Sequence, residues 1–490
     1  MAPQGIDHFT LWNLGPQQIV ADFQGGRIVS DAGLLAVRAL ERPLRVIADL
    51  AQQLPDPRAP KFITHSVEAI LTQEVYALLA GYPDHNDADD LRTDPLFQIL
   101  ADVSPDAEQP LASGSTLARF QYAFTRRQAE LPAEQRPVLL EVRAAQIQRL
   151  KILNGYLLDL FVRTRAQAPT EIILDVDATD DPTHGAQALS GYHGYYRQHQ
   201  YLPLHVYEGH SGFPLAAWLR PGTIHASLGA VDILRPIVAR LRAAWPGVTI
   251  LVRADNGLAV PAVYEFCEAE GLDYVIGYAT NAVLERATAS ALDDLERYYR
   301  LYGQRRGEPV QRFEEVRDYQ AGSWPYPRRV IAKVEVMPQG SQRRFVVTNR
   351  VAWPEVIYRE LYVQRGAIPE QPIGDMKNGL RCERLSSCGF CANALRLLVH
   401  ALAYAIVVLF REASAGIEEV AVASVGTLRQ RLWKVGAVVV TNTRRVWLHL
   451  SETWPYRALW ARVYEAVQGY VARRPAPVAG PPVAVPGLAR

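Results

Sequence analysis

Strand-like and helix-like hydrophobic patterns alternate between residues 171 and 277, and this order constrains the fold more than any other feature of the chain. Three short β-rich runs come first, at 172–176, 201–206 and 214–219. Two helix–strand pairs follow, at 233–245 with 248–252 and at 260–270 with 273–277. Three strands followed by helix, strand, helix and strand predict a mixed sheet with flanking helices, which is an α/β layout.

The segments on either side of this pattern predict other elements. Residues 1–165 are mostly helical in pattern, with Ser30-Asp31 as an N-cap before an apolar run and with Gly81 ending a helix over 67–79. Residues 281–355 predict a charged helix and two strands, at 282–301, 329–336 and 343–349. Further on, the pattern predicts helices over 356–380 and 394–412, a hairpin at 436–441 with 445–450, and a disordered tail from Arg473.

Composition excludes some classes of protein without choosing one. The 490 residues are 49% hydrophobic and 21% charged, which is ordinary for a globular chain with a sizeable core. The net charge of +1 does not by itself indicate a nucleic-acid-binding protein. Nearly all of the cationic residues are Arg, however, and the guanidinium group of Arg binds phosphate oxygens well. We expect no signal peptide, no membrane span and no disulfide framework, and hence a cytoplasmic, nucleoid-associated protein.

Carboxylates fall where the expected strands end. Asp175 and Asp177 alternate with apolar residues and share one face of their strand, and Asp255 follows another strand directly. With Glu370 near the start of a later helix, such groups could hold Mg²⁺, which prefers oxygen ligands. An equally physical interpretation is that Asp175 caps a turn or pairs with an Arg, and that Asp255-Asn-Gly is simply a turn.

An ordered set of motifs resembles a known family. The segment Leu174-Asp-Val-Asp-Ala-Thr-Asp-Asp-Pro-Thr-His-Gly-Ala-Gln187 is similar to the first motif of the group 1 DDE transposases of bacterial insertion sequences, and Val252-Arg-Ala-Asp-Asn-Gly257 is similar to their second. Tyr362-Val-Gln-Arg-Gly366, with Glu370 and Lys377, resembles the signature around their third acidic residue. The resemblance extends in order over roughly residues 8–470, including 81–87, 91–95, 115–119 and 393–398.

This resemblance implies an RNase H-like mixed sheet interrupted by an inserted β-rich segment, with helical N-terminal and C-terminal regions. It implies that Asp177, Asp255 and Glu370 are the catalytic, metal-binding residues for Mg²⁺, with Mn²⁺ as a substitute. Asp175 is the alternative to Asp177. DNA phosphates would be contacted by Tyr362, Arg365 and Lys377.

The same resemblance divides the chain into regions. They are an inverted-repeat-binding region (1–165), the first part of the catalytic core (166–280), the insertion (281–355), the remainder of the core (356–415), a basic C-terminal region (416–473) and the tail (474–490). The implied activity is cleavage at the element's ends and strand transfer into target DNA, with double-stranded DNA as partner and a homodimer in the complex. The alternatives are an inactive DNA-binding descendant and an RNase H-like nuclease without strand transfer.

One departure from the family pattern concerns the third acidic residue. The family has three residues between its Arg and Glu, whereas four residues, Gly366–Pro369, separate Arg365 from Glu370. Because Pro369 and Pro372 indicate a helix start, we expect a local bulge with Glu370 retained as ligand, and Asp375 as an outside candidate.

Several other residues admit two interpretations. Cys382, Cys388, Cys391 and His400 suggest zinc only weakly, since they hold one Cys-x-x-Cys pair, and free thiols are the simpler interpretation. Core packing is the simpler interpretation of Trp324 and Trp353. Turn hydrogen bonds and a role near the site are equally open for His184 and Gln187. A DNA surface and a solvated hairpin face are equally open for a basic cluster, comprising Arg429, Arg431, Lys434, Arg444, Arg445 and Trp447.

Overall fold

The computed structural model describes residues 8–56, 58–107, 109–123, 136–303, 307–364 and 370–474, with side chains described from 147 in the helix that begins at 136 and from 371 in the helix that begins at 370. These residues form two compact units. The first is drawn from 8–48, 60–118 and 410–474, and the second from 49–59 and 119–409. The expected tail after Arg474 lies outside the described residues.

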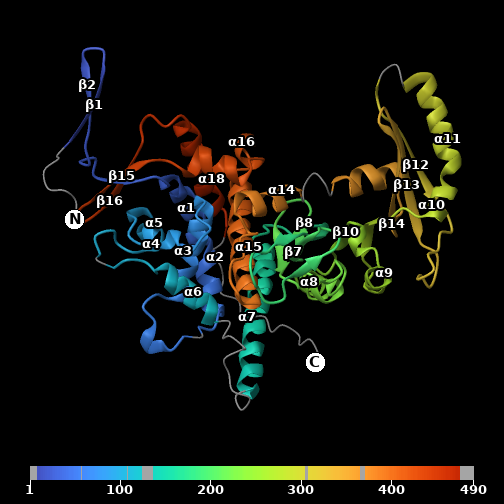
Figure 1. The fold of residues 1–490 in the computed structure, drawn as a ribbon, viewed down its shortest axis with the longest axis horizontal. Helices are drawn as coiled ribbons and strands as arrows, with labels where there is room; N and C mark the ends of the chain where they lie inside the picture. The colour runs from blue at the N-terminus through green and yellow to red at the C-terminus, as the bar shows by residue number, and fades with distance from the viewer. Residues whose placement is uncertain are drawn as a thin grey trace. The chain divides into compact units, whose positions relative to one another are not determined.

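The second unit is built on an eight-stranded mixed sheet, counted over the described residues (Figure 1). Its order is β12-β13-β14-β11-β10-β4-β8-β9. The strands are β4 (Glu171–Ala178), β8 (Leu204–Glu208), β9 (Pro214–Trp218), β10 (Thr249–Ala254), β11 (Asp273–Tyr278), β12 (Val310–Val316), β13 (Arg329–Met337) and β14 (Gly340–Thr348). β4 runs parallel to β10 and antiparallel to β8, and β10 runs parallel to β11. The expected mixed α/β sheet is therefore confirmed.

Both faces of this sheet are covered, which explains why its central strands are mostly apolar and almost entirely buried. One face is packed by η7 (Ile357–Tyr362), whose Ile357 and Tyr358 join a buried cluster with Ile173 and Leu251. The opposite face is packed by α9 (Pro261–Ala269) through the ring of Tyr264. Because side chains alternate along a strand, Asp175 and Asp177 lie on the face of Ile173, under η7.

The segment 281–355 does not form a separate layer. β14 pairs antiparallel with β11, so the expected hairpin extends the central sheet and a third strand, β12, adds to it. The expected helix 282–301 is divided into α10 (Ala282–Ala287), α11 (Ala289–Tyr298) and a π-helical turn, η6 (Tyr299–Gly303). α10 ends at Thr288, whose hydroxyl donates to the Leu284 carbonyl at 2.8 Å. α11 lies along β12 and β13 (Figure 1).

The run expected as one strand over 201–206 is two strands in different sheets. β7 (Gln198–Tyr201) joins a small sheet with β5 (Asp181–Pro182) and β6 (Gly191–His193), whereas β8 begins at Leu204 in the large sheet. Pro203 lies between them, and its ring removes the N–H that a continuous ladder would use. The expectation of a single strand was therefore wrong.

The longest apolar helix of the chain is α15 (Phe390–Ala413). By length and composition alone it could cross a membrane, but its apolar window is completely buried inside the protein. It is therefore packed as a core helix, with Arg396 and His400 also buried.

The first unit combines helices with short strands, of which the sequence pattern predicted the hairpin of β15 and β16 but not the strands near the N-terminus. Its helices include α1 (Leu35–Leu44), α3 (Val67–Ala80), α5 (Pro95–Leu100) and α18 (Arg457–Ala472). Its strands are β1 (Phe9–Leu14), β2 (Gln17–Ala21), β3 (Arg27–Val29), β15 (Ala437–Thr441) and β16 (Val446–Leu450). β3 completes a sheet with β15 and β16, so the mostly helical N-terminal region begins with strands.

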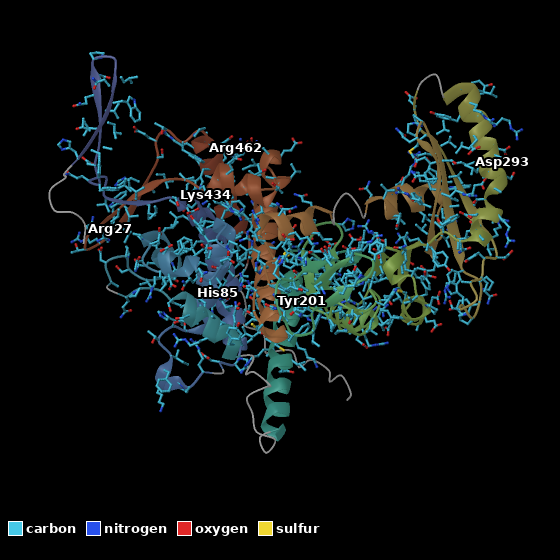
Figure 2. The ribbon with its side chains drawn as sticks, viewed as in Figure 1. Arg27, His85, Tyr201, Asp293, Lys434 and Arg462 are labelled. Atoms are coloured by element: carbon cyan, nitrogen blue, oxygen red, sulfur yellow. The ribbon has the colours of Figure 1, made fainter. Side chains whose placement is uncertain are left out.

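Asp31 anchors the first unit, although not as the expected N-cap. Its side chain makes no capping hydrogen bond to the turn that it precedes. Instead, its carboxylate accepts from Lys434 Nζ at 3.0 Å and from the Tyr82 hydroxyl at 3.2 Å (Lys434 is labelled in Figure 2). Burial is the largest single influence on the pKa of Lys434, and it lowers that pKa. Asp31 and Tyr82 together raise it by more, so the pKa of Lys434 is raised overall. A tertiary ion pair has replaced the local cap.

Gly222 tests how closely the small sheet packs on its neighbours. A Cβ at Gly222 would lie 1.8 Å from the backbone oxygen of Gln200, which cannot swing away as a side chain can. We expect Gly222→Ala to lower the free energy of unfolding by about 1–3 kcal/mol in urea titrations. The control Gly247→Ala, whose Cβ would meet nothing within 4 Å, should change it by less than about 0.5 kcal/mol. Equal stability of the two variants would contradict the close approach.

Candidate functional site

A buried ion pair joins the two strands on which the first two acidic motifs lie. Arg253 donates from Nε to Asp175 Oδ1 and from Nη2 to Asp175 Oδ2, both at 2.6 Å. The side chains are 2% and 1% exposed. Two parallel hydrogen bonds fix the guanidinium in the plane of the carboxylate, which is the strongest geometry for such a pair. Asp175 therefore pairs with an Arg, as one of its two interpretations held.

The same arginine reaches a third segment. Its Nη1 donates to the Leu361 carbonyl at 3.0 Å, at the end of the π-helical turn η7. Gly209 makes room for this arrangement, since a Cβ there would lie 2.8 Å from both Asp175 Oδ2 and Arg253 Nη2. One buried guanidinium thus connects β4, β10 and η7, which lie far apart in the sequence.

Asp177 and Asp255 occupy neighbouring positions at the carboxyl ends of two parallel strands. In the register of β4 and β10, Arg253 lies opposite Asp175 and Ala254 opposite Val176. One further step places Asp255 beside Asp177. Both are half-buried. Because side chains two positions apart on a strand share a face, Asp177 and Asp255 lie on the face of the sheet on which Asp175 and Arg253 pair. The expectation that separated segments bring these carboxylates to one sheet edge agrees with this register.

Asp255 also makes the turn that its second interpretation predicted. Its Oδ1 accepts from the Gly257 backbone N–H at 2.9 Å and caps the short helix η5 (Asn256–Leu258). The bond involves Oδ1, and capping is compatible with metal coordination because a carboxylate has several acceptor positions. The two interpretations of Asp255 therefore do not exclude each other.

Tyr362 lies against the backbone beside Asp255. A Cβ at Gly277 would be 2.5 Å from the Tyr362 hydroxyl and 3.3 Å from the carbonyl carbon of Asp255. Gly277 on β11 therefore leaves the space in which the phenol ends. Arg365, the next member of this signature, lies outside the described residues.

The segment with the third acidic residue packs on the same part of the second unit. α14 begins at Glu370, as the prolines predicted, and the side chain of Glu370 is outside the described part of the chain. Pro372 lies close to Gly212: a Cβ added to Gly212 would be 3.0 Å from Pro372 Cγ. The following π-helical turn η8 (Asp375–Gly379) buries Asp375 and directs Lys377 to Asp180, with Nζ 2.8 Å from Oδ1.

The residue beside Asp177 on the neighbouring strand β8 is buried and uncharged at neutral pH. His205 on β8 lies opposite Asp177, and its ring stacks on that of Tyr207. Burial first, and then the positive charge of Lys377, lowers the pKa of His205 to about 3. A neutral imidazole adds no charge beneath the carboxylates. Lys377 supplies a positive charge close by, since its Nζ lies 2.8 Å from Asp180 Oδ1.

Sequence reasoning missed two acidic residues of the first motif, Asp180 and Asp181. The pairing of Asp180 with Lys377 outweighs its burial and lowers the pKa of Asp180. Asp181 is 2% exposed, and neither carboxylate oxygen has a hydrogen-bond partner among the described residues. Burial, opposed by Lys377, raises the pKa of Asp181 to about 8. The run Asp180-Asp181-Pro182 was a usable signal, because two adjacent carboxylates on a strand end must point in different directions.

The other singled-out residues are distributed between core and surface. Gln187 donates to the Leu385 carbonyl at 2.8 Å and accepts from the buried Asn393 at 3.1 Å, so it ties the first motif to α15. Trp324 packs among tyrosines and is 4% exposed, as expected. Trp353 is 81% exposed, so the expectation of core packing was wrong there. It precedes Pro354 at the start of a helix and its ring is left outside the fold.

The cysteines and the residues of the basic cluster do not gather into one site within the described part of the chain. No three His, Cys, Asp or Glu side chains form a metal-binding group there, and the four cysteines are free thiols. In the basic cluster, Arg429 donates to the backbone carbonyls of Leu78 and Leu79 and Lys434 binds Asp31, so both have internal roles. Arg445 and Trp447 remain on the hairpin surface, 5.5 Å from guanidinium carbon to ring centre.

Comparison with known proteins gives two findings and one negative result. The model of the transposase DDE domain group 1 family matches residues 13–472. A solved structure titled "Cryo-EM structure of piggyBac transposase synaptic complex with hairpin DNA (SNHP)" is similar at 12% identity and a TM-score of 0.40, over 93% of this chain and 87% of that one. No curated protein matches.

The buried pair can be tested by removing one partner. Asp175→Ala leaves the Arg253 guanidinium buried without its carboxylate, and we expect a loss of about 3–5 kcal/mol in the free energy of unfolding. The matched control is Glu355→Ala, which removes a pair with Arg359 whose side chains are 61% and 55% exposed. That loss should stay below about 1 kcal/mol in the same urea titration. Similar losses in both variants would show that the buried pair is not special.

Asp181 makes a pH-dependent prediction. Its pKa is raised from 3.8 to about 8 in the folded chain, so the folded state holds a proton that the unfolded state releases. Its contribution to stability is full below pH 3.8 and is lost as pH rises toward 8. As pH goes from 5 to 8, we expect the free energy of unfolding of Asp181→Asn to rise relative to that of wild type, by up to about 1.4 kcal/mol per pH unit. Thermal unfolding of both proteins across this pH range measures the difference. A constant difference across that range would contradict the assignment.

Proposed function

We propose a function for this chain from one premise: it belongs to the transposase DDE domain group 1 family. We propose that it cuts DNA at the ends of an insertion sequence and joins the freed ends to target DNA by in-line phosphodiester chemistry. The observation that carries the proposal is the register of β4 and β10, which brings Asp177 and Asp255 side by side at the carboxyl ends of parallel strands. Open α/β sheets form their sites at such ends.

The proposed core is RNase H-like. Three antiparallel strands followed by two parallel ones, in the order β9-β8-β4-β10-β11, support this assignment. We regard β12, β13 and β14, with α10 and α11, as an insertion that extends the core sheet before the third acidic residue. The region boundaries at 165, 280, 355, 415 and 473 remain predictions.

The donor set suits a hard divalent cation. Asp177 and Asp255 offer carboxylate oxygens, the ligands that Mg²⁺ prefers, and we propose Glu370 as the third carboxylate and Mn²⁺ as a substitute metal. Bound in pairs, such ions activate an attacking oxygen and stabilise the leaving oxygen of a phosphodiester. Asp175 is excluded from this set in our proposal because both of its oxygens are engaged by Arg253.

The remaining residues orient this site. The Arg253 guanidinium holds β4, β10 and the Leu361 end of η7 together, so it fixes the spacing of Asp177, Asp255 and Tyr362. We propose that Tyr362 and Arg365 bind phosphate oxygens near the cut. Lys377 provides a positive charge for the same purpose while its Nζ is held 2.8 Å from Asp180.

We further propose the partners and the setting of the reaction. The terminal inverted repeats and the target are double-stranded DNA, two copies of the chain pair two ends, and the protein works in the cytoplasm at the nucleoid. The extra residue before Glu370 favours one alternative, a transposase descendant that binds the repeats without cutting. A nuclease that cuts without strand transfer is the other alternative.

The test is a cleavage and strand-transfer assay on DNA with the repeats that flank the gene, in Mg²⁺. We expect Asp177→Asn, Asp255→Asn and Glu370→Gln each to lower cleavage at least about 10³-fold while repeat binding persists, since each removes a metal-ligating charge. The control Asp293→Asn changes an exposed carboxylate on α11 (labelled in Figure 2) and should cut at the wild-type rate.

Each outcome has a distinct meaning. Full activity of Glu370→Gln would show that another group, with Asp375 the first to test, is the third ligand. Wild-type protein that binds the repeats and never cuts would favour the binding-only descendant. Cleavage without joined products would favour the nuclease.

A further inference from the structure

A short hairpin beside the proposed site is unusually rich in aromatic rings. It consists of β6, β7 and the turn between them, residues 191–201, and we call it the aromatic hairpin. Its sequence is Gly191-Tyr-His-Gly-Tyr-Tyr-Arg-Gln-His-Gln-Tyr201. The family motifs discussed above do not include it, and none of the proposed chemistry uses it.

The base of the aromatic hairpin is fixed to the strand end that follows Asp177. β7 pairs with β5, where Tyr201 lies opposite Asp181 and Gln200 opposite Pro182. Gln198 donates from Nε2 to Asp180 Oδ2 at 2.9 Å, and the Tyr201 hydroxyl donates to the Ala188 carbonyl at 2.8 Å (Tyr201 is labelled in Figure 2). The base is therefore held in place by the segment that carries the first acidic motif.

The base also packs closely on its neighbours. A Cβ at Gly191 would lie 2.3 Å from Thr223 Cγ2, and one at Gly222 would lie 1.8 Å from the Gln200 carbonyl oxygen. Two glycines on facing segments thus allow backbone and side chain to touch. The base of the aromatic hairpin is therefore in direct contact with the segment around Gly222.

The tip of the aromatic hairpin exposes rings that the core does not use. Tyr195 is 83% exposed and Tyr192 is 56% exposed. Tyr196 supports Tyr195 from one side, edge to face with ring centres 5.0 Å apart, and itself contacts His193 at 5.2 Å. Tyr192 rests on His199 in the same way, with ring centres 5.7 Å apart, so each exposed ring has a supported side and a side open to solvent.

A cation completes the tip. Arg197 is exposed and has a φ of 58°, the left-handed conformation that closes the turn, and its N–H donates to the His193 carbonyl at 2.7 Å. Exposed aromatic rings beside a guanidinium are the combination by which proteins hold unpaired nucleic acid: the rings stack on bases and the cation attracts the phosphates.

The hydrogen bond from Gln198 to Asp180 locates the hairpin beside the acidic residues, and the electrostatics of Tyr196 agree with it. Burial first, and then the carboxylates around it, raise the pKa of Tyr196 to about 12, so its hydroxyl stays protonated. The carboxylates are those of Asp180, Asp177 and Asp255. This agrees with the hydrogen bond from Gln198 to Asp180, two residues further along the same hairpin.

We propose that the aromatic hairpin binds the scissile DNA strand, with Tyr195 and Tyr192 stacking on an unpaired base next to the cut bond and Arg197 contacting its phosphate. The proposal rests on the proposed function, because it uses the position of the cut. DNA is favoured over a protein partner because the tip adjoins the carboxylates at which we place the cut and carries a cation.

The direct test is photo-crosslinking in Ca²⁺, which permits binding while cleavage is withheld. The probe is the flanking-repeat duplex with 5-iodouracil substituted in turn at the nucleotides on either side of the cut bond, and crosslinked peptides are identified by mass spectrometry. We expect the crosslinks to fall on Tyr195 or Tyr192. Crosslinks that fall only on other residues would overturn the proposal.

The kinetic test uses matched variants in Mg²⁺. We expect Tyr195→Ala to slow cleavage of the paired duplex about 5- to 150-fold, the range that one base stacked on one ring contributes. Tyr195→Phe should restore the rate, because the ring is retained. The control Tyr298→Ala removes another exposed tyrosine that rests on a second one, Tyr302, with ring centres 5.1 Å apart, and should cut normally.

A third comparison separates stacking from folding and from the proposed function. On DNA already unpaired at the crosslinked position, the defect of Tyr195→Ala should shrink at least about threefold, because the cost of unpairing is removed. An equal defect on both substrates would overturn the stacking role. A change in self-association of Tyr195→Ala without any change in crosslinking would point to a protein contact instead. If wild type crosslinks at Tyr195 but never cuts, the proposed function fails while the DNA contact stands.

Discussion

The buried pair of Asp175 and Arg253 is the interaction on which the proposed site depends. Both oxygens of the carboxylate are used by one guanidinium, and the remaining N–H of that guanidinium holds the carbonyl of Leu361. Taking two charges out of water is costly unless the geometry is this complete. This pair fixes the positions of its neighbours. It holds β4 and β10 in register two residues before Asp177 and Asp255, and it attaches the turn that ends in Tyr362 to both strands.

Much of this arrangement could be predicted from local pattern. Period-two alternation placed Asp175 and Asp177 on one face, and the order of strands and helices gave the mixed sheet. Which aspartate pairs with an Arg could not be predicted, because the partner is set by the register of β10 against β4. The same limit applies to the strands after residue 300, whose hydrophobic pattern predicted a hairpin but not that β14 would pair with β11. Register is non-local information.

In the first unit, contacts with distant residues override what the local sequence predicts. Asp31 had every local sign of an N-cap, but its carboxylate binds Lys434, 403 positions later. β3, three residues long, becomes a strand only because β15 supplies its partner. Short segments with little periodicity of their own take their structure from whatever they meet. Trp353 in the second unit is a similar failure of local prediction, since its residue type is typical of cores but its ring is exposed to solvent.

The separation between the buried pair and the half-buried carboxylates beyond it has a consequence for how copies of such a gene decay. Substitutions at Asp177 or Asp255 fall at the margin of the core and remove charge where water already reaches. Substitutions at Asp175 or Arg253 leave an unpaired charge in the interior and act on the fold itself. Under the proposed function, a copy that has lost Asp177 or Asp255 therefore loses its chemistry while the buried pair that holds its strands together stays intact.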